Sequence, residues 1–324
     1  MRQKKAMPWI LRRILFKKSD LFETASKFKT LMRTDKKKVF KILKNNQQDF
    51  PNEIALAVIV KNEGAYLSEW IEYHRLIGVT KFYIYDNDSD DNLDLLLSRY
   101  VEKGIVTIIK IHGEKRQLDA YEDAIEKAQS ETKWLGVIDA DEFIYVKKGY
   151  RLIDILEKYH HVGMLIGWMI FGSSGYTKKT KGLVIERFTH RANDQFIADY
   201  KMIFNPRKAL RFKQPHYVQM FGNVIDENGK RVRSYPYVTQ IQAEPASKNL
   251  IRINHYYTKS LSEFEQKSKR GYADYSKSDN VQRVQRSISD FQEHDRNEVF
   301  DDSMSEFVPK IYENIEANNI GDIG

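Results

Sequence analysis

From residue 54 onward the chain alternates between two patterns of hydrophobic and polar positions. Largely apolar runs at 54–60, 81–85, 106–111 and 134–138 predict four strands. Between them, apolar residues recur at helical spacing in 66–77, 92–103 and 118–128, which predicts three helices. Strands and helices in this order indicate right-handed βαβ units, and therefore an α/β fold with a mostly parallel central sheet and flanking helices.

The pattern loosens after Gly149. Residues 162–171, 182–188 and 201–204 are expected to form strands, 261–269 a helix, and 281–317 one or two surface helices. We therefore expect three parts: a helical arm at 1–50, a catalytic domain at 51–275 and a helical C-terminal extension at 276–324.

The arm has a basic amphipathic pattern near its start. Its apolar and basic residues interleave at Met7, Trp9, Ile10, Leu11, Arg12, Arg13, Ile14, Leu15, Phe16, Lys17 and Lys18. Such a helix can lie on an anionic membrane surface, where apolar burial and Lys/Arg attraction add together. The alternative is a helix that packs on the catalytic domain with its basic face in water.

Composition narrows the class of protein. A chain of 324 residues with 41% hydrophobic content can bury a sizeable core, and the absence of cysteine excludes disulfides and thiolate metal sites. No apolar run approaches the roughly 20 residues of a membrane-spanning helix, and no signal peptide is evident, so we expect a cytoplasmic protein, soluble or peripheral on the inner face of the membrane. Residues 1–50 carry 15 Lys/Arg against 4 Asp/Glu, which leaves 38 against 41 for the rest. Because the folded part is slightly acidic, nucleic acid is not expected as a partner.

The strongest chemical signal is WLGVIDADEF at 134–143, where an apolar strand runs into two acids. Ligands of open parallel sheets bind beyond the carboxyl ends of the strands. Asp139 and Asp141 are two residues apart, so both carboxylates can reach one Mn²⁺ or Mg²⁺ ion at a bent strand end. That cation can bridge a nucleoside diphosphate and offset the charge on the leaving group. The alternative for such a pair is a solvated turn or a helix cap.

Two further polar segments follow predicted strands. Asp86 and Asn87 end the second strand, where they can contact a ribose or base, or simply form a turn and helix cap. His255 follows an apolar stretch and is a candidate third metal ligand, with a core role as the alternative. Beyond it, Ser262 and Glu265 match a capping box for the next helix.

Six separated motifs occur in order along the chain: VKNEGAYLSEWIEYHRLIGVTKFYIYDNDSDD (60–91), QLDAYEDAI (117–125), WLGVIDADEFI (134–144), WMIFGSSG (168–175), GLVIERF (182–188) and HYYTKSLSEFEQKSKRG (255–271). Together they resemble glycosyltransferase family 92, also known as DUF23, and its bacterial relatives in the broad family-2-like clan. The resemblance implies a GT-A fold, a nucleotide-sugar donor, a cation on the Asp-x-Asp pair and inversion at the sugar. Unlike eukaryotic members, this sequence contains no cysteine, and we expect no membrane anchor in it.

Residue roles follow from the same resemblance. Nucleoside contacts are expected at Lys61, Asn62, Glu63, Asp86 and Asn87; diphosphate contacts at Gln117, Tyr121, Asp139, Lys259, Lys267 and Arg270; metal ligands at Asp139, Asp141 and His255; and donor-sugar or acceptor contacts at Trp168, Phe171, Gly172, Ser173 and Ser174.

Inversion requires a general base within hydrogen-bond reach of the acceptor hydroxyl. The later acids are Glu186, Asp194, Asp199 and Asp226. Glu186 on an expected strand and Asp194 in a polar loop are the two preferred, and the sequence does not decide between them.

The sequence therefore predicts metal-dependent transfer of a hexose from UDP, or a related nucleotide, to a glycan or lipid-linked acceptor. One alternative is a nucleotidyltransferase, although Asn62-Glu63-Gly64 stands where a Gly-rich phosphate loop is usual. The other is a catalytically inactive membrane or binding module on the same fold.

Overall fold

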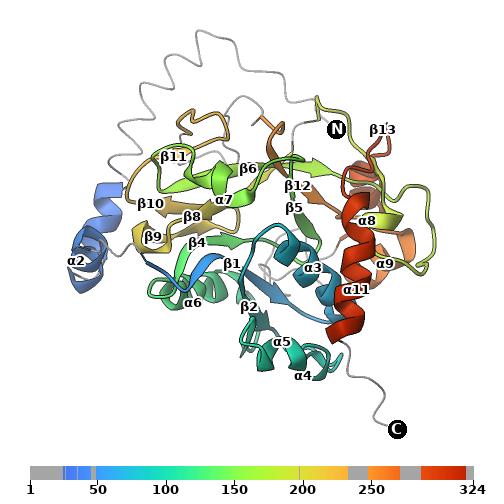
Figure 1. The fold of residues 1–324 in the computed structure, drawn as a ribbon, viewed down its shortest axis with the longest axis horizontal. Coiled ribbons are helices and arrows are strands. Elements are labelled where there is room, and N and C mark those ends of the chain that lie inside the picture. The colour runs from blue at the N-terminus through green and yellow to red at the C-terminus, as the bar shows by residue number, and fades with distance from the viewer. Residues whose placement is uncertain are drawn as a thin grey trace.

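The computed structural model describes residues 25–34 except 26, 36–44, 49–232 except 197, 247–270 and 286–318. The strands of the main sheet are β1 (Asn52–Val60), β2 (Lys81–Asp86), β3 (Val106–Lys110), β4 (Thr132–Val137), β5 (Glu142–Val146), β6 (Gly163–Ile170), β8 (Tyr200–Phe204), β11 (Val224–Ile225) and β12 (Ile251–His255). They lie in the order β3-β2-β1-β4-β8-β6-β12-β5, with β11 beside β6 (Figure 1).

Most neighbours in this sheet are parallel, and only β8 and β5 run against the rest. Strand β8 is antiparallel to β4 and β6, and β5 is antiparallel to β12. The edge that receives the carboxyl ends of β1, β2, β4, β6 and β12 therefore also receives the first residues of β8 and β5. The predicted α/β fold, with a mostly parallel central sheet and flanking helices, is confirmed.

The helices cover both faces of the sheet. They are α2 (Lys36–Lys44), α3 (Gly64–Leu76), α4 (Leu93–Leu96), α5 (Ser98–Glu102), α6 (Gln117–Ala128), α7 (Leu152–Glu157), α8 (Val184–Arg187), α9 (Leu261–Arg270), α10 (Ile288–His294) and α11 (Val308–Asn318), with 3₁₀ turns η1 (Pro206–Lys208) and η2 (Ser305–Phe307). Two small antiparallel pairs join β9 (Ala209–Gln214) to β10 (Tyr217–Met220) and β7 (His190–Arg191) to β13 (Val299–Phe300).

Side-chain size along β1 determines how closely the helices on each face approach the sheet. Ile54, Leu56 and Val58 point into the core beneath α3 and α11, whereas Ala55 and Ala57 point toward α6. Helix α6 presents alanines at 120, 124 and 128 to the same core, so helix and strand pack with small residues on both sides. Successive strand residues face opposite sides, and one strand therefore serves two different cores.

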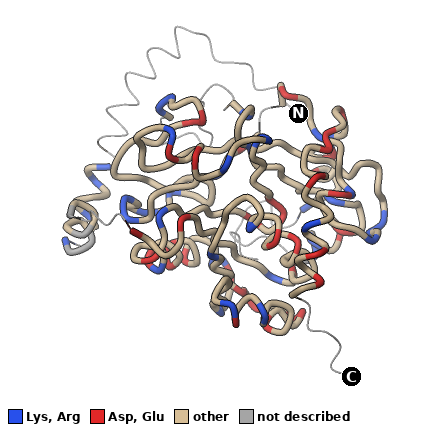
Figure 2. Tube along the Cα trace, in the orientation of Figure 1, with Lys and Arg blue, Asp and Glu red and all other residues tan. Residues whose placement is uncertain are grey.

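Helix α11, in the C-terminal segment, packs on α3. Ile311 of α11 is fully buried, and the Asn314 side chain donates to Glu72 over 3.0 Å. The predicted boundary at residue 275 and the basic helix predicted at 7–18 lie outside the described residues. In the described part of the chain, no helix is long and apolar enough to span a membrane. Lys, Arg, Asp and Glu are interspersed over most of the fold (Figure 2).

Three local predictions are wrong. The helix expected at 92–103 is divided at Leu97 into α4 and α5. Residues 182–188, expected as a strand, contain the short helix α8. The capping box of α9 uses Ser260 and Glu263, two residues earlier than predicted: the Glu263 carboxylate accepts from the Ser260 amide, and the Ser260 hydroxyl accepts from the Glu263 amide.

Candidate active site

Asp139 is the centre of a polar cluster at the carboxyl edge of the sheet. It follows β4, and its carboxylate accepts from Tyr121 over 3.2 Å and from Gln117 over 3.5 Å. The ammonium of Lys201, at the start of β8, lies 3.0 Å away on the other carboxylate oxygen. The Asp139 side chain is one-third exposed, whereas that of Lys201 is only 1% exposed. The lysine therefore contacts the carboxylate from the buried side. The structure thus brings three predicted site residues together.

Asp141 lies beside the other predicted metal ligand. His255 ends β12, and its Nε2 is 3.6 Å from an Asp141 carboxylate oxygen. The ammonium of Lys267, from α9, pairs with the second oxygen. All three side chains are largely buried. Asp141 is therefore flanked by one imidazole and one ammonium, each delivered by an element that begins more than 100 residues later.

Burial and neighbouring charge together fix the ionisation of these groups. Burial would raise the pKa of both aspartates, but Lys201 lowers that of Asp139, and Lys267 and His255 lower that of Asp141. Burial lowers the pKa of His255 despite the attraction of Asp141. Both carboxylates are accordingly charged at neutral pH and the imidazole is neutral.

Sequence reasoning missed three residues of this cluster. Besides Lys201, Glu142 is fully buried, lies 3.8 Å from the Lys201 ammonium and has its pKa raised by burial. His216, whose pKa burial and Lys201 lower to about 4, packs its ring 5.1 Å from Trp168. The available signal was a lysine among the apolar residues of YKMIF (200–204), at a position that faces inward.

The predicted nucleoside-contact residues after β1 and β2 hold two loops together. Asn62 has a φ of 54°, its amide donates to Ser89 over 3.0 Å, and its side chain accepts from the Asp90 amide over 2.8 Å. Asn62 therefore has a structural role in joining the two loops, and its side chain is half-buried.

The residues that end β2 also form hydrogen bonds with the surrounding loops. Asp86 accepts from Lys110 and from the Ser89 amide. The Asn87 side chain donates to two backbone carbonyls of the loop that follows β3. Lys61 is exposed, whereas Glu63 lies 3.9 Å from the Lys259 ammonium.

The predicted sugar loop divides into two parts. Trp168, on β6, has its ring 4.2 Å from that of His255 and so lies in the site. Phe171 and Ser173 are buried, and the amides of Ser173 and Ser174 donate to Asp295 and Asn297. A Cβ at Gly172 would lie 2.4 Å from the Arg296 carbonyl oxygen, so glycine is needed for this close approach. The loop is thereby fixed to the segment that follows α10.

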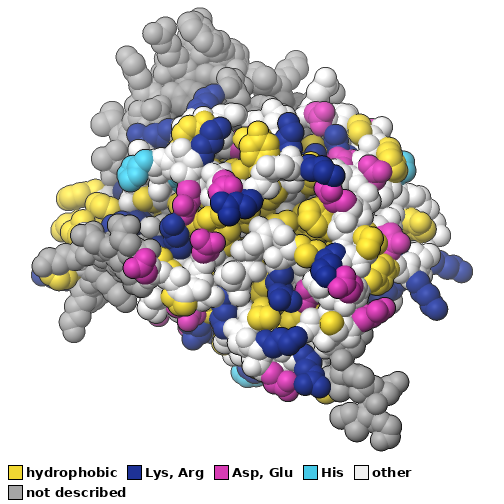
Figure 3. Space-filling view, viewed as in Figure 1, with side chains coloured by type: hydrophobic (Ala, Val, Ile, Leu, Met, Phe, Trp, Pro, Cys, Tyr) yellow, Lys and Arg dark blue, Asp and Glu magenta, His cyan; other side chains and the backbone are white. Residues whose placement is uncertain are grey.

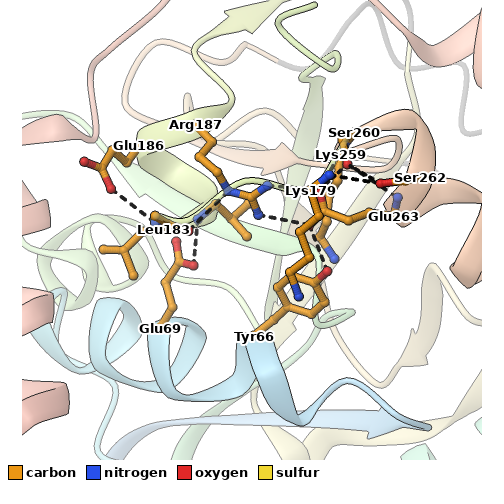
Figure 4. Close-up of polar contacts among 12 residues, drawn as sticks. Tyr66, Glu69, Lys179, Leu183, Glu186, Arg187, Lys259, Ser260, Ser262 and Glu263 are labelled. Carbon is orange, nitrogen blue, oxygen red and sulfur yellow. Dashed lines mark hydrogen bonds and ion pairs between the residues drawn. The ribbon is translucent and has the colours of Figure 1, made fainter. Parts of the chain in front are cut away.

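A second buried network orients α9 and Lys259, which lies two residues before that helix. Arg187 donates twice to Glu263, over 3.0 Å each, and Tyr66 donates to the same carboxylate over 2.8 Å. The Lys259 ammonium lies 3.7 Å from the Tyr66 ring centroid. Figure 4 shows these contacts joining α3, α8 and the start of α9. This network fixes the helix that carries Lys267; Arg270 ends the same helix, and its side chain lies outside the described part.

The predicted general bases occupy different surroundings. Glu186 points away from Glu263 in Figure 4. Its carboxylate accepts hydrogen bonds from the Leu183 amide and from the Tyr312 hydroxyl. Asp194 is 80% exposed and pairs with Arg191. Asp226 accepts from two amides of its own turn, and the amide of Trp168 donates to the Asp199 carbonyl. Glu186 therefore has a structural role at the start of α8 rather than the strand position expected for it.

Comparison with known proteins identifies the family. A model of glycosyltransferase family 92 matches residues 56–301. The chain belongs to glycosyltransferase family 92. A family 92 glycosyltransferase protein of Ricinus communis is 27% identical over 69% of this chain and 39% of its own length. One from Oryza sativa is 33% identical over 43% of this chain and 25% of its own length. The chain thus spans about two fifths or less of these relatives.

Among solved structures, residues 1–349 of S. aureus TarS match 48% of this chain and 47% of their own, with 12% identity and a TM-score of 0.33. The same protein has also been solved with UDP-GlcNAc and with UDP. The family assignment rests on the sequence match alone.

The resemblance to family 92 implies a divalent cation, and the side chains of Asp139, Asp141 and His255 are of the chemical types that bind one. Two ionised carboxylates and a neutral imidazole are suitable ligands for Mn²⁺ or Mg²⁺. Within the described ranges, no three His, Asp or Glu side chains already stand together as a metal site. The Lys267 ammonium occupies one oxygen of Asp141, so a cation would bind the other oxygen, which faces His255, or replace the ammonium.

Proposed function

We propose that this family 92 protein transfers a hexose from a nucleotide sugar, with UDP as the nucleotide, to a glycan or lipid-linked acceptor with inversion. The observation that carries the proposal is the convergence of Asp139, Asp141 and His255 with Gln117 and Tyr121 at the carboxyl edge of the sheet. This is the edge where ligands of open α/β sheets bind.

The side chains divide into two roles in this proposal. Asp139, Asp141 and His255 would hold a Mn²⁺ or Mg²⁺ ion, which when bound neutralises the diphosphate of the leaving nucleotide. Lys267 and Lys259 are the lysines whose charge acts on Asp141, and either ammonium can donate to a phosphate oxygen. Trp168 packs on His255 and offers an apolar wall to a sugar ring.

Asp194 is 80% exposed, so an acceptor hydroxyl can reach its carboxylate, and it is our candidate for the base that takes the acceptor proton. We also propose a cytoplasmic location. Membership of family 92 counts against the nucleotidyltransferase alternative.

The test is a thermal-shift panel of UDP and UDP-sugars with and without Mn²⁺. A ligand that binds only the folded protein raises its stability, by about 2.7 kcal/mol at a hundredfold excess over Kd. Asp141→Asn should remove the Mn²⁺-dependent part of the UDP shift and abolish transfer. The matched control is Asp154→Asn, because Asp154 is an exposed acid on α7 paired with Arg151. Absence of any UDP shift in the wild-type protein, with or without metal, would favour an inactive module.

A further inference from the structure

Two short basic helices precede the sheet and lie against one side of the domain. We call residues 27–33 and α2 the N-terminal helix pair. The buried Thr30 hydroxyl donates to Gln219 of β10 over 2.8 Å, and Lys208 of η1 donates to the Ile42 carbonyl over 2.7 Å. Ile42 is 2% exposed. Each helix therefore has an inner face fixed to the domain by a buried residue.

Away from these buried residues, each helix carries large apolar side chains that are more than half exposed. Phe28 and Met32 are 64% and 72% exposed, and Phe40 and Leu43 are 58% and 55% exposed. Residues two apart on a helix point about 200° apart, whereas residues three or four apart share a face. Phe28 and Met32 thus lie opposite Thr30, and Phe40 lies opposite Ile42.

The location of these side chains makes them unusual. Single exposed apolar residues are ordinary, but clusters on one surface mark interaction sites. Figure 3 shows hydrophobic atoms at the left edge of the molecule, over the helix pair and beside Lys and Arg.

The same surface is positively charged. None of the described residues of the helix pair is acidic, and Lys29, Arg33 and Lys36 are exposed. On the first helix, Lys29 and Arg33 flank the Phe28–Met32 face at the next angular position. Strand β9 adds Arg211 and Lys213, and the pKa of Lys213 is lowered by partial burial and then by the charges of Arg211 and Lys29. The positive charges of Lys29, Arg211 and Lys213 therefore lie close together, on the first helix and on β9.

We propose that the N-terminal helix pair docks on an anionic lipid surface, with Phe28, Met32, Phe40 and Leu43 entering the interface and Lys29, Arg33 and Lys36 meeting the headgroups. Apolar side chains in the centre with basic residues at the flanks are the pattern of interfacial helices. A second copy of this chain fits poorly, because a two-fold contact would place the same basic residues opposite each other. Nucleic acid would satisfy the charges but leave the apolar residues without a role.

The experiment is co-sedimentation of the full-length protein with phosphatidylcholine vesicles that contain or lack phosphatidylglycerol. We expect binding only to the anionic vesicles. Lys29→Ser/Arg33→Ser should weaken it about fivefold for each charge, and added salt should reduce that difference. Phe28→Ser/Leu43→Ser should weaken it by roughly tenfold or more. The matched control is Leu95→Ser/Phe300→Ser, which removes one Leu and one Phe that are each 62% exposed elsewhere, and it should bind as the wild type does.

Three results would overturn the proposal. The first is equal binding by Phe28→Ser/Leu43→Ser and the wild type. The second is loss of all vesicle binding on deletion of residues 1–24 with the helix pair intact, which would assign the contact to the earlier segment. The third is a wild-type dimer by light scattering that Phe28→Ser/Leu43→Ser dissociates, without vesicle binding by either protein. Circular dichroism of each variant verifies that it is folded.

Discussion

Replacing Lys201 with Met tests whether the buried ammonium holds the acidic edge of the sheet together. The side chain is 1% exposed and lies 3.0 Å from Asp139 and 3.8 Å from Glu142. Removing one partner of a buried ion pair costs about 3–5 kcal/mol, because the remaining charge has lost its compensation. Asp139 is one-third exposed, so water screens part of its share, and Glu142 can take up a proton. We therefore expect a loss of about 3 kcal/mol, measured by urea unfolding.

Two companion variants make the result interpretable. Adding Glu142→Gln to Lys201→Met removes the fully buried carboxylate, so more than half of the lost stability should return. Lys133→Met breaks the pair with Glu157, in which both side chains are more than one-third exposed, and should cost less than about 1 kcal/mol. The reasoning is refuted if Lys201→Met costs no more than Lys133→Met, or if Glu142→Gln recovers nothing.

Three further predictions concern the site and its supports. Arg187→Met should lose about 3–5 kcal/mol in urea unfolding, because Glu263 would stay buried without its bidentate partner; a loss below about 1 kcal/mol would contradict this. Burial raises the pKa of Glu69 from 4.5 to about 7, so the folded state binds a proton more tightly than the unfolded state, and this group makes stability fall as pH rises from 4.5 to 7. Glu69→Gln should flatten the profile in that window, and an unchanged slope would refute the assignment. His255→Ala should raise the Mn²⁺ concentration needed for UDP binding; an unchanged midpoint would remove His255 from the metal site.

Local sequence patterns were sufficient for the first half of the fold. Strands β1 to β4 and helices α3 and α6 follow from apolar spacing, because each depends on residues a few positions apart. The helix expected at 92–103 is the exception, since it is divided into α4 and α5. The large and small residues that alternate along β1 likewise match the two cores. The pattern was insufficient at 182–188, where an apolar run that suits a strand forms α8, whose first amides donate to the buried Glu69 carboxylate. A contact 115 residues away in sequence is invisible to local periodicity.

For the candidate site, the sequence by itself determined that two carboxylates follow β4 and that a histidine follows a later apolar stretch. Their charged partners depended on the tertiary structure. Lys201 reaches Asp139 because β8 runs antiparallel and brings its first residues to the carboxyl edge, and Lys267 reaches Asp141 because Arg187 and Glu263 fix α9. The direction of a strand and the placement of a helix arise from contacts across the whole chain, whereas the residue type at a strand end is written in the sequence.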